Sequence, residues 1–235
     1  YVHHVMGDAI SATRWDASKR SGGIVLEIIL KDEDTGLPII KDALGYDTDL
    51  AGYEPCYFRD VLIENNLLMD NSFSSIAVKQ LKKWGFRPNN DKTTAPKYYH
   101  TEEQGWYPHR DITIQNNYLD HDQYELGANT IYLTNSKESV IQHNYSVGAG
   151  TSAIELNQTD DIVVQWNEIY RARKKATGTD SNAIDPDRSA TNALIQYNYI
   201  HSCGDGILLC GFNYGSSVVR YNVIKDSDPE KRYLN

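Results

Sequence analysis

Three aspartates, Asp180, Asp185 and Asp187, lie within eight residues of one another. Two of them flank a proline in the segment I-D-P-D. In an extended chain, alternation places Asp185 and Asp187 on one face and Ile184 and Pro186 on the other. Neighbouring carboxylates repel each other, so the arrangement indicates one of three things: paired catalytic carboxyls, a calcium site or a solvated turn.

A repeated motif indicates how these acids are positioned. Six segments place a β-branched residue three positions before an asparagine, as in I-T-I-Q-N-N and L-I-Q-Y-N-Y. The asparagines recur at intervals of 51, 27, 23, 31 and 24 residues and are Asn66, Asn117, Asn144, Asn167, Asn198 and Asn222. Such a period predicts an all-β fold, a right-handed parallel β-helix with loop insertions. The asparagines should stack at one corner, where we expect each to tolerate a left-handed turn and to bond its neighbours.

A second strand recurs in each predicted coil. Its inward isoleucines align as Ile76, Ile131, Ile154, Ile184 and Ile207, and residues 21–27 fit the same strand with Ile24 inward. The outward positions then place Glu155 beside Asp185, with Tyr132 one coil away, and Asn157 beside Asp187. An acidic and polar patch is therefore predicted on the outer face of one sheet.

The whole chain, residues 1–235, is predicted to be a single β-helix domain. Two segments, 27–58 and 84–108, interrupt the repeat and are expected to be loop excursions that build a groove wall. Because Tyr1 begins inside a predicted coil, we expect further polypeptide, from the same chain or a partner subunit, to cap the N-terminal end of the solenoid.

The composition of the chain limits the kinds of partner and metal that it is expected to bind. The net charge of −9 argues against nucleic acid or an anionic membrane as the main partner, and no apolar run is long enough to span a bilayer. The three cysteines, Cys56, Cys203 and Cys210, contain no C-x-x-C pattern, so a zinc site is not expected. Cys203 and Cys210 either pair across a turn or remain buried thiols, and buried thiols are the default interpretation.

Crowded carboxyls suit cleavage of a glycosidic bond. One carboxyl must be protonated and the other ionised, and crowding separates their pKa values. Glu155, Asp185 and Asp187 supply the crowding, and Arg188 or His201 could tune it. A calcium site built from the same acids with Asn157 is the main alternative.

The segment D-S-N-A-I-D-P-D-R, followed by N-A-L-I-Q-Y-N-Y-I-H and G-D-G-I-L-L-C, resembles glycoside hydrolase family 136, the lacto-N-biosidases. The resemblance extends over the repeats from Tyr1 to Asn235. It implies a retaining glycosidase with Asp187 as nucleophile and Asp180 as acid/base, which releases lacto-N-biose from the non-reducing end of milk-type glycans. Family members carry a further helical region before the β-helix. For Asp180 to approach Asp187, residues 177–182 must fold back over the strand.

The predicted substrate is therefore an oligosaccharide, and the expected location is extracellular, secreted or at the surface of a bacterium. No cofactor is expected to be required, and a structural calcium ion is an alternative use of the acids. The residues expected to contact substrate are Asp185, Glu155, Asn157, Arg188, His201, Asp205 and Tyr132.

Two other functions compete with this prediction. A polysaccharide lyase or a polygalacturonase-like enzyme could use the same fold, but a lyase needs a basic side chain beside its acids, and no lysine immediately neighbours them. A non-catalytic glycan-binding or adhesin β-helix is the second alternative. It predicts neither crowded acids nor a groove wall. His201 and Asp205 also have simpler interpretations as turn residues.

Overall fold

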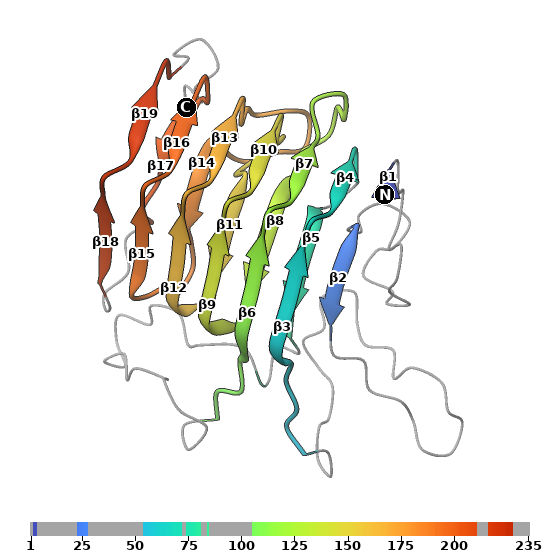
Figure 1. Ribbon diagram of the computed structural model, residues 1–235, viewed down its shortest axis with the longest axis vertical. Helices are drawn as coiled ribbons and strands as arrows, with labels where there is room; N and C mark the ends of the chain where they lie inside the picture. Colours follow the sequence, from blue (N-terminus) through green and yellow to red (C-terminus); the bar gives the residue numbers. More distant parts are fainter. Residues whose placement is uncertain are drawn as a thin grey trace.

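The chain forms a parallel β-helix of three sheets in the computed structural model, which describes residues 2–3, 23–27, 54–71, 74–80, 84, 105–210 and 216–227. Successive coils pass through the sheets in the same order, and all paired strands are parallel (Figure 1). The predicted parallel solenoid is confirmed. It differs from the prediction in having three strands in each coil.

The three sheets are called A, B and C. Sheet A contains β1 (Val2–His3), β4 (Leu67–Met69), β7 (Tyr118–Asp120), β10 (Tyr145–Val147), β13 (Glu168–Tyr170), β16 (Tyr199–His201) and β19 (Val223–Lys225). Sheet B contains β2 (Ile24–Glu27), β5 (Ser74–Lys79), β8 (Asn129–Thr134), β11 (Ile154–Asn157), β14 (Asn182–Pro186) and β17 (Asp205–Ile207). Sheet C contains β3 (Arg59–Glu64), β6 (His109–Gln115), β9 (Ser136–Gln142), β12 (Asp160–Gln165), β15 (Ala193–Gln196) and β18 (Ser217–Arg220).

The recurring asparagines form a continuous hydrogen-bonded ladder at the corner between sheets C and A. Each side-chain amide donates to the Oδ1 atom of the next asparagine at 2.9–3.0 Å. The same Oδ1 atom accepts a second bond from the backbone amide of the previous asparagine. The predicted stacking of all six asparagines is therefore confirmed.

The left-handed turn at this corner lies one residue earlier than predicted. The residue before each asparagine has a positive φ of 53° to 59°, as at Asn65, Asn116 and Trp166. The chain therefore turns before the ladder asparagine, whose amide is left free to bond the coils on both sides. This turn splits each predicted strand in two and explains the third sheet.

The core runs along the axis of the solenoid as rows of identical or similar residues. Sheet B contributes the predicted isoleucine row, in which Ile76, Ile131, Ile154 and Ile184 are fully buried. Ile24 and Ile207 extend the row at its ends and are partly buried. The inward stack of this sheet is therefore confirmed.

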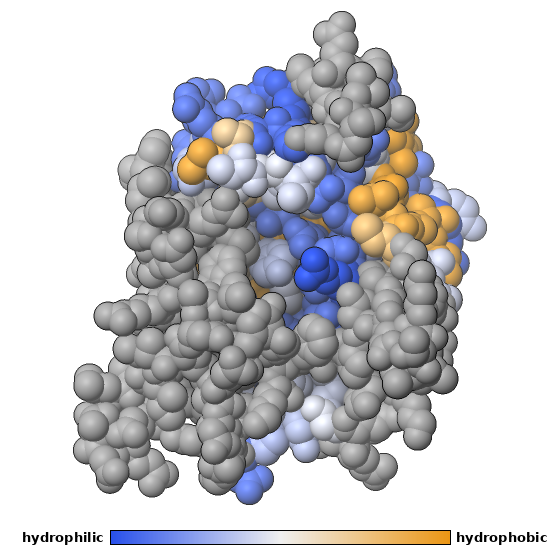
Figure 2. All heavy atoms as spheres, turned by 180° about the vertical axis from the view of Figure 1, so that it is seen from behind, coloured by the Kyte–Doolittle hydropathy of each residue, from blue (hydrophilic) through white to orange (hydrophobic). Residues whose placement is uncertain are grey.

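The last described coil leaves large apolar side chains exposed. Ile224 is 47% exposed, although the equivalent Ile200 in the previous coil is 1% exposed. Leu208 and Leu209 are also exposed, and an apolar patch appears on the right of Figure 2. The predicted cap concerned the other, N-terminal end and stays a prediction. The excursions 27–58 and 84–108 lie mostly outside the described residues.

We predict that Asn144→Ala lowers the free energy of unfolding by about 3–5 kcal/mol, since the change leaves several buried groups without partners. Asn144 accepts two bonds from Asn117, and its amide donates to Asn167 Oδ1 and to the carbonyls of Ile114 and Gln142. Urea unfolding followed by circular dichroism measures the loss.

Asn222→Ala is the matched control, because Asn222 lies at the end of the ladder and is only partly buried. It should cost about 1 kcal/mol. Equal losses in the two variants would show that the buried ladder does not fix the coil stacking.

Candidate functional site

The predicted acidic patch lies on the outer face of sheet B. Glu155 of β11 pairs with Asp185 of β14 on one side and with Tyr132 of β8 on the other. Viewed from behind, the molecule has hydrophilic residues in the hollow at its centre (Figure 2). The predicted adjacency of Glu155, Asp185 and Tyr132 is confirmed by this register. Their roles toward substrate stay predictions.

A bulge at the beginning of β8, and a pair of successive buried residues at the same place in the next two coils, create a second outward row. The amides of Thr130 and Ile131 both donate to the carbonyl of Ala153, and both side chains are fully buried. Two successive inward residues break the simple alternation. The residue before them, Asn129 in this coil, therefore returns to the outer face. The equivalent residues of the next coils are Ser152, Asn182 and Asp205.

This outward row supplies hydrogen bonds that hold both carboxylates. Asn129 Nδ2 donates to Glu155 Oε2 at 3.0 Å. Ser152 Oγ donates to Asp185 Oδ2 at 2.8 Å, and Asn182 Nδ2 donates to the same oxygen at 3.2 Å. Asn129, Ser152 and Asn182 are all less than 5% exposed, so these bonds are protected from water. The sequence reasoning overlooked all three residues because it assumed unbroken alternation.

Glu155 has the larger pKa shift of the pair. Burial raises its pKa from the ordinary 4.5 to about 7, and the hydrogen bond from Asn129 opposes this. The negative charges of Asp185, Asp187 and Asp180 add to the increase. Glu155 therefore keeps its proton to a higher pH than an ordinary glutamate does.

Asp185 is 3% exposed and its pKa is raised by burial from 3.8 to about 6. The bonds from Ser152 and Asn182 oppose the increase, and the charges of Asp187 and Asp180 add to it. Asp185 thus loses its proton at a lower pH than Glu155 does. This order of pKa values is the one that a pair of one acid and one base requires.

Asp187 and Asn157 follow the pair at the far end of the strands. The Asp187 amide donates to the Leu156 carbonyl, so the two coils stay in contact beyond Pro186. Cys210 Sγ lies 3.8 Å from Asp185 Oδ1, and burial raises the pKa of this thiol to about 12. Cys210 is therefore a protonated neighbour of the acids. All three cysteines are free thiols, so the pairing alternative for Cys203 and Cys210 is not found.

Residues 177–182, which the prediction folds back toward Asp187, lead into the beginning of β14. Asp180 donates its amide to Thr151 Oγ1 of the preceding coil and lies beside the beginning of β14, whereas Asp187 follows its end. The strand's five residues span roughly 16 Å. Gly178 lets the chain pass close to the preceding coil, because a Cβ at this position would lie 2.1 Å from the Gly150 carbonyl oxygen. The pairing of Asp180 with Asp187 as catalytic carboxyls stays a prediction.

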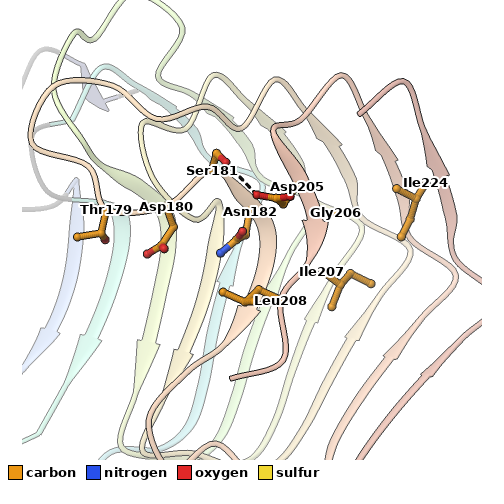
Figure 3. Close-up of a pocket in the computed structure, with 9 residues that line it drawn as sticks. All are labelled: Thr179, Asp180, Ser181, Asn182, Asp205, Gly206, Ile207, Leu208 and Ile224. Carbon is orange, nitrogen blue, oxygen red and sulfur yellow. Dashed lines mark hydrogen bonds between the residues drawn. The ribbon is translucent and has the colours of Figure 1, made fainter. Parts of the chain in front are cut away.

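A pocket of about 470 Å³ adjoins the beginning of β14. Asp180, Asn182 and Asp205 line it together with the apolar Leu208 and Ile224. Asp180 and Asn182 point to the same side in Figure 3, and Ser181 points away and donates to Asp205 Oδ2 at 3.2 Å. The pocket thus brings Asp180 and Asp205 to one surface, where they can bond hydroxyl groups.

Two further predicted residues lie apart from the carboxylate pair. His201 is on sheet A, where it stacks on Tyr170 and Tyr199, and its Nε2 atom lies 3.1 Å from Glu168 Oε1. It therefore belongs to another face of the solenoid. Arg188 is exposed in the turn after β14, and its carbonyl accepts a bond from the Gln158 amide.

Among the described residues, no three His, Cys, Asp or Glu side chains converge closely enough to hold a metal ion together. The acids of sheet B are spread along two coils and are bound by amide and hydroxyl donors, which compete with a cation for their oxygens. A structural calcium ion on these residues stays an untested alternative.

The repeats place the chain among known β-helices. Residues 105–230 match a family described as the right-handed β-helix region. The chain belongs to this right-handed β-helix family. The predicted handedness is thereby confirmed. The fold is a right-handed parallel β-helix.

Individual relatives match only part of the chain. Pectate lyase 3 of Pectobacterium carotovorum is 33% identical over 82 residues, which cover 30% of this chain and 22% of the relative. Pectate lyase 3 of Pectobacterium carotovorum subsp. carotovorum is 32% identical over 82 residues, with the same coverage. The match therefore spans about a fifth of these relatives. No solved structure matches the chain significantly.

Across the part of the chain that the structure describes, no helix has the length and apolar character needed to cross a membrane.

We predict that Glu155→Gln stabilises the protein at pH 8 and not at pH 4. A carboxyl with a raised folded-state pKa binds its proton more tightly in the folded than in the unfolded state. Stability from this group is therefore complete below about pH 4.5 and is lost as the pH rises to about 7. The amide removes that loss and can still accept the Asn129 bond. Urea unfolding at both pH values measures the difference.

The control is Glu125→Gln, which removes one exposed negative charge elsewhere. Its effect should be similar at the two pH values. If Glu155→Gln also shows no dependence on pH, the Glu155 carboxyl is not held protonated by its surroundings.

Proposed function

We propose that the chain is a carbohydrate-cleaving enzyme, and that it hydrolyses glycosidic bonds on the outer face of sheet B. The observation that supports this most strongly is the Glu155–Asp185 pair, with raised pKa values of about 7 and about 6 on adjacent coils. Glu155 acts as the general acid and Asp185 as the ionised partner. This assignment differs from the Asp180–Asp187 pair that the family resemblance implies.

The hydrogen bonds support this division of roles. Asp185 Oδ2 accepts two donors and Glu155 Oε2 accepts one, so the ionised state is better stabilised on Asp185. The remaining oxygens are Glu155 Oε1 and Asp185 Oδ1, and Asp185 Oδ1 accepts only a weak bond from the Cys210 thiol at 3.8 Å. These are the two atoms proposed to meet the substrate. In the first step, Oε1 gives its proton to the departing glycosidic oxygen, and Asp185 Oδ1 approaches the anomeric carbon.

The coil spacing favours a retaining reaction. Paired positions on adjacent parallel strands lie about 4.8 Å apart, and carboxyls of retaining glycosidases lie about 5–5.5 Å apart. A covalent glycosyl–Asp185 intermediate would then be hydrolysed by water that Glu155 deprotonates. Burial, helped by the charges of Asp185, Asp187 and Asp180, holds a proton on Glu155. Asp180 and Asp205 contact sugar hydroxyls in the adjoining pocket.

The substrate proposed is an oligosaccharide with an accessible non-reducing end. The resemblance to lacto-N-biosidases supports lacto-N-biose as the released unit, with Tyr132, Asn157 and Arg188 as contacts around the pair. The local similarity to two pectate lyases supports action on glycans.

We predict that Glu155→Gln and Asp185→Asn each lower kcat on natural oligosaccharides by on the order of 10³-fold, because each removes one partner of a two-carboxyl mechanism. On an aryl glycoside with a good leaving group, Glu155→Gln should keep its glycosylation step and Asp185→Asn should not. Product release from a glycan panel and burst kinetics measure these effects, with Glu125→Gln as the control. Near-native rates in both variants would place the active site elsewhere.

A polysaccharide lyase is the second candidate, supported by the identity with pectate lyases and by the exposed Arg188 next to Asp187. Here Arg188 would remove a proton beside a uronate, whose charge the site would have to neutralise. Polygalacturonate incubated with and without calcium separates the candidates, since a lyase forms an unsaturated product that absorbs in the ultraviolet. A reducing end without such absorbance indicates hydrolysis.

A further inference from the structure

Four aromatic side chains occupy the turn between sheets C and A in consecutive coils. We call them the aromatic strip, and they are His143, Trp166, Tyr197 and Tyr221. Each has a positive φ of 53° to 55° and directly precedes a ladder asparagine. In Figure 1 this turn lies where the sheet C strands β9, β12, β15 and β18 meet the sheet A strands β10, β13, β16 and β19.

The backbone of this turn does not favour aromatic residues. A left-handed conformation is uncommon for bulky side chains, whereas asparagine adopts it several times more readily than most residues. Two earlier coils of the same ladder carry Asn65 and Asn116 at this position. The strip therefore places strained aromatic residues where the same protein elsewhere uses the residue that the turn prefers. A strained choice of this kind is a reason to look for a function.

Packing in the core does not explain why these residues are aromatic either, because their side chains are exposed. Trp166 is 46% exposed, Tyr197 is 44% exposed and Tyr221 is 67% exposed. Their rings are nearly parallel, with centroids 5.1, 6.0 and 5.2 Å apart along the strip. Such distances correspond to rings stacked on one another with an offset, so the strip exposes ring edges and the offset margins of the faces. The Arg220 guanidinium also lies over the Tyr221 ring, 5.6 Å from its centroid.

A ladder of neutral amides runs beside the strip on the outer face of sheet C. The side chains of Gln142, Gln165 and Gln196 are joined by Nε2–Oε1 bonds of 2.8–2.9 Å. The ladder ends in charged residues only at Glu64 and Arg220. Each glutamine amide has a second N–H and a second acceptor position. The central part of the flank is therefore uncharged and can form hydrogen bonds.

We propose that the aromatic strip, with Gln142 and Gln165, is a second, non-catalytic binding surface for an extended, uncharged polysaccharide. The strip repeats once per coil, about every 4.8 Å, which is comparable to one sugar unit of an extended glycan. Apolar faces of the sugars rest on the exposed ring surfaces, and their hydroxyls bond the glutamine amides. The site lies at the corner of sheets C and A, whereas the carboxylate pair is on sheet B. It can therefore hold a polymer independently of cleavage.

A single file of side chains suits a polymer better than a folded protein. A stable protein interface buries about 800 Å² on each partner, far more than four side chains in one row provide. The glutamine flank carries no charge between Glu64 and Arg220, and the nearest charges on the sheet A side are those of Glu168 and its partner His201. A protein partner or a second copy of this chain is therefore an alternative outcome of the test.

The test uses Trp166→Asn and Tyr197→Asn, which install the residue already present in the equivalent turns at Asn65 and Asn116. All proteins carry Glu155→Gln, so that binding is measured without turnover. Affinity electrophoresis is run in gels containing hydroxyethyl cellulose, galactomannan or polygalacturonate. We expect retardation by at least one neutral polymer, and a loss of affinity on the order of tenfold in each variant. The melting temperature should stay the same or rise.

The matched control is Tyr118→Thr, which removes an exposed tyrosine of sheet A outside the strip. It should leave the affinity unchanged. Lower melting temperatures with unchanged affinity would make the strip a structural stack only, and no retardation by any neutral polymer would overturn the proposal. Retardation by polygalacturonate alone would contradict an uncharged ligand. Self-association that the two asparagine variants abolish would instead identify a second copy as the occupant. The proteins differ only at the strip or at Tyr118, so the comparison of their affinities holds even if Glu155 and Asp185 are not catalytic.

Discussion

The asparagine ladder is the interaction on which the rest of this structure depends. Each ladder asparagine bonds the coil before it and the coil after it, through both its side chain and the backbone amide of its neighbour. A shift of one residue in any coil would break these bonds and turn every side chain of that coil to the opposite face. The ladder thereby fixes the register between neighbouring coils at one corner, and the strands of all three sheets follow that register.

Fixed register is what creates the proposed active site. Glu155 and Asp185 are 30 positions apart in the sequence numbering, and only in-register stacking makes them neighbours. Their crowding and burial destabilise the ionised folded state, as their raised pKa values show. The long ladder and the isoleucine row stabilise the same coils and offset that cost. The strained aromatic strip relies on the same support.

Much of this arrangement could be predicted from the sequence because the same residue types, asparagine and isoleucine, recur at equivalent positions of successive coils. The asparagine spacing and the Ile154–Ile184 alignment were sufficient to place Glu155 beside Asp185. The bulge was not predictable, because the small residues that turn inward, such as Ala153, carry no strong signal. The bonds from Asn129 and Ser152 were missed for that reason. The path of Asp180 depends on contacts with the preceding coil, which spacing within the sequence does not show.

The most direct test of this account is an NMR titration of the Glu155 carboxyl carbon, assigned by its loss in Glu155→Gln. The account predicts a midpoint near 7 in the native protein, and a lower midpoint in Asp185→Asn because one negative neighbour is removed. A native midpoint near the ordinary value of 4.5, unchanged by Asp185→Asn, would contradict the claim that coil stacking creates a protonated carboxyl for catalysis.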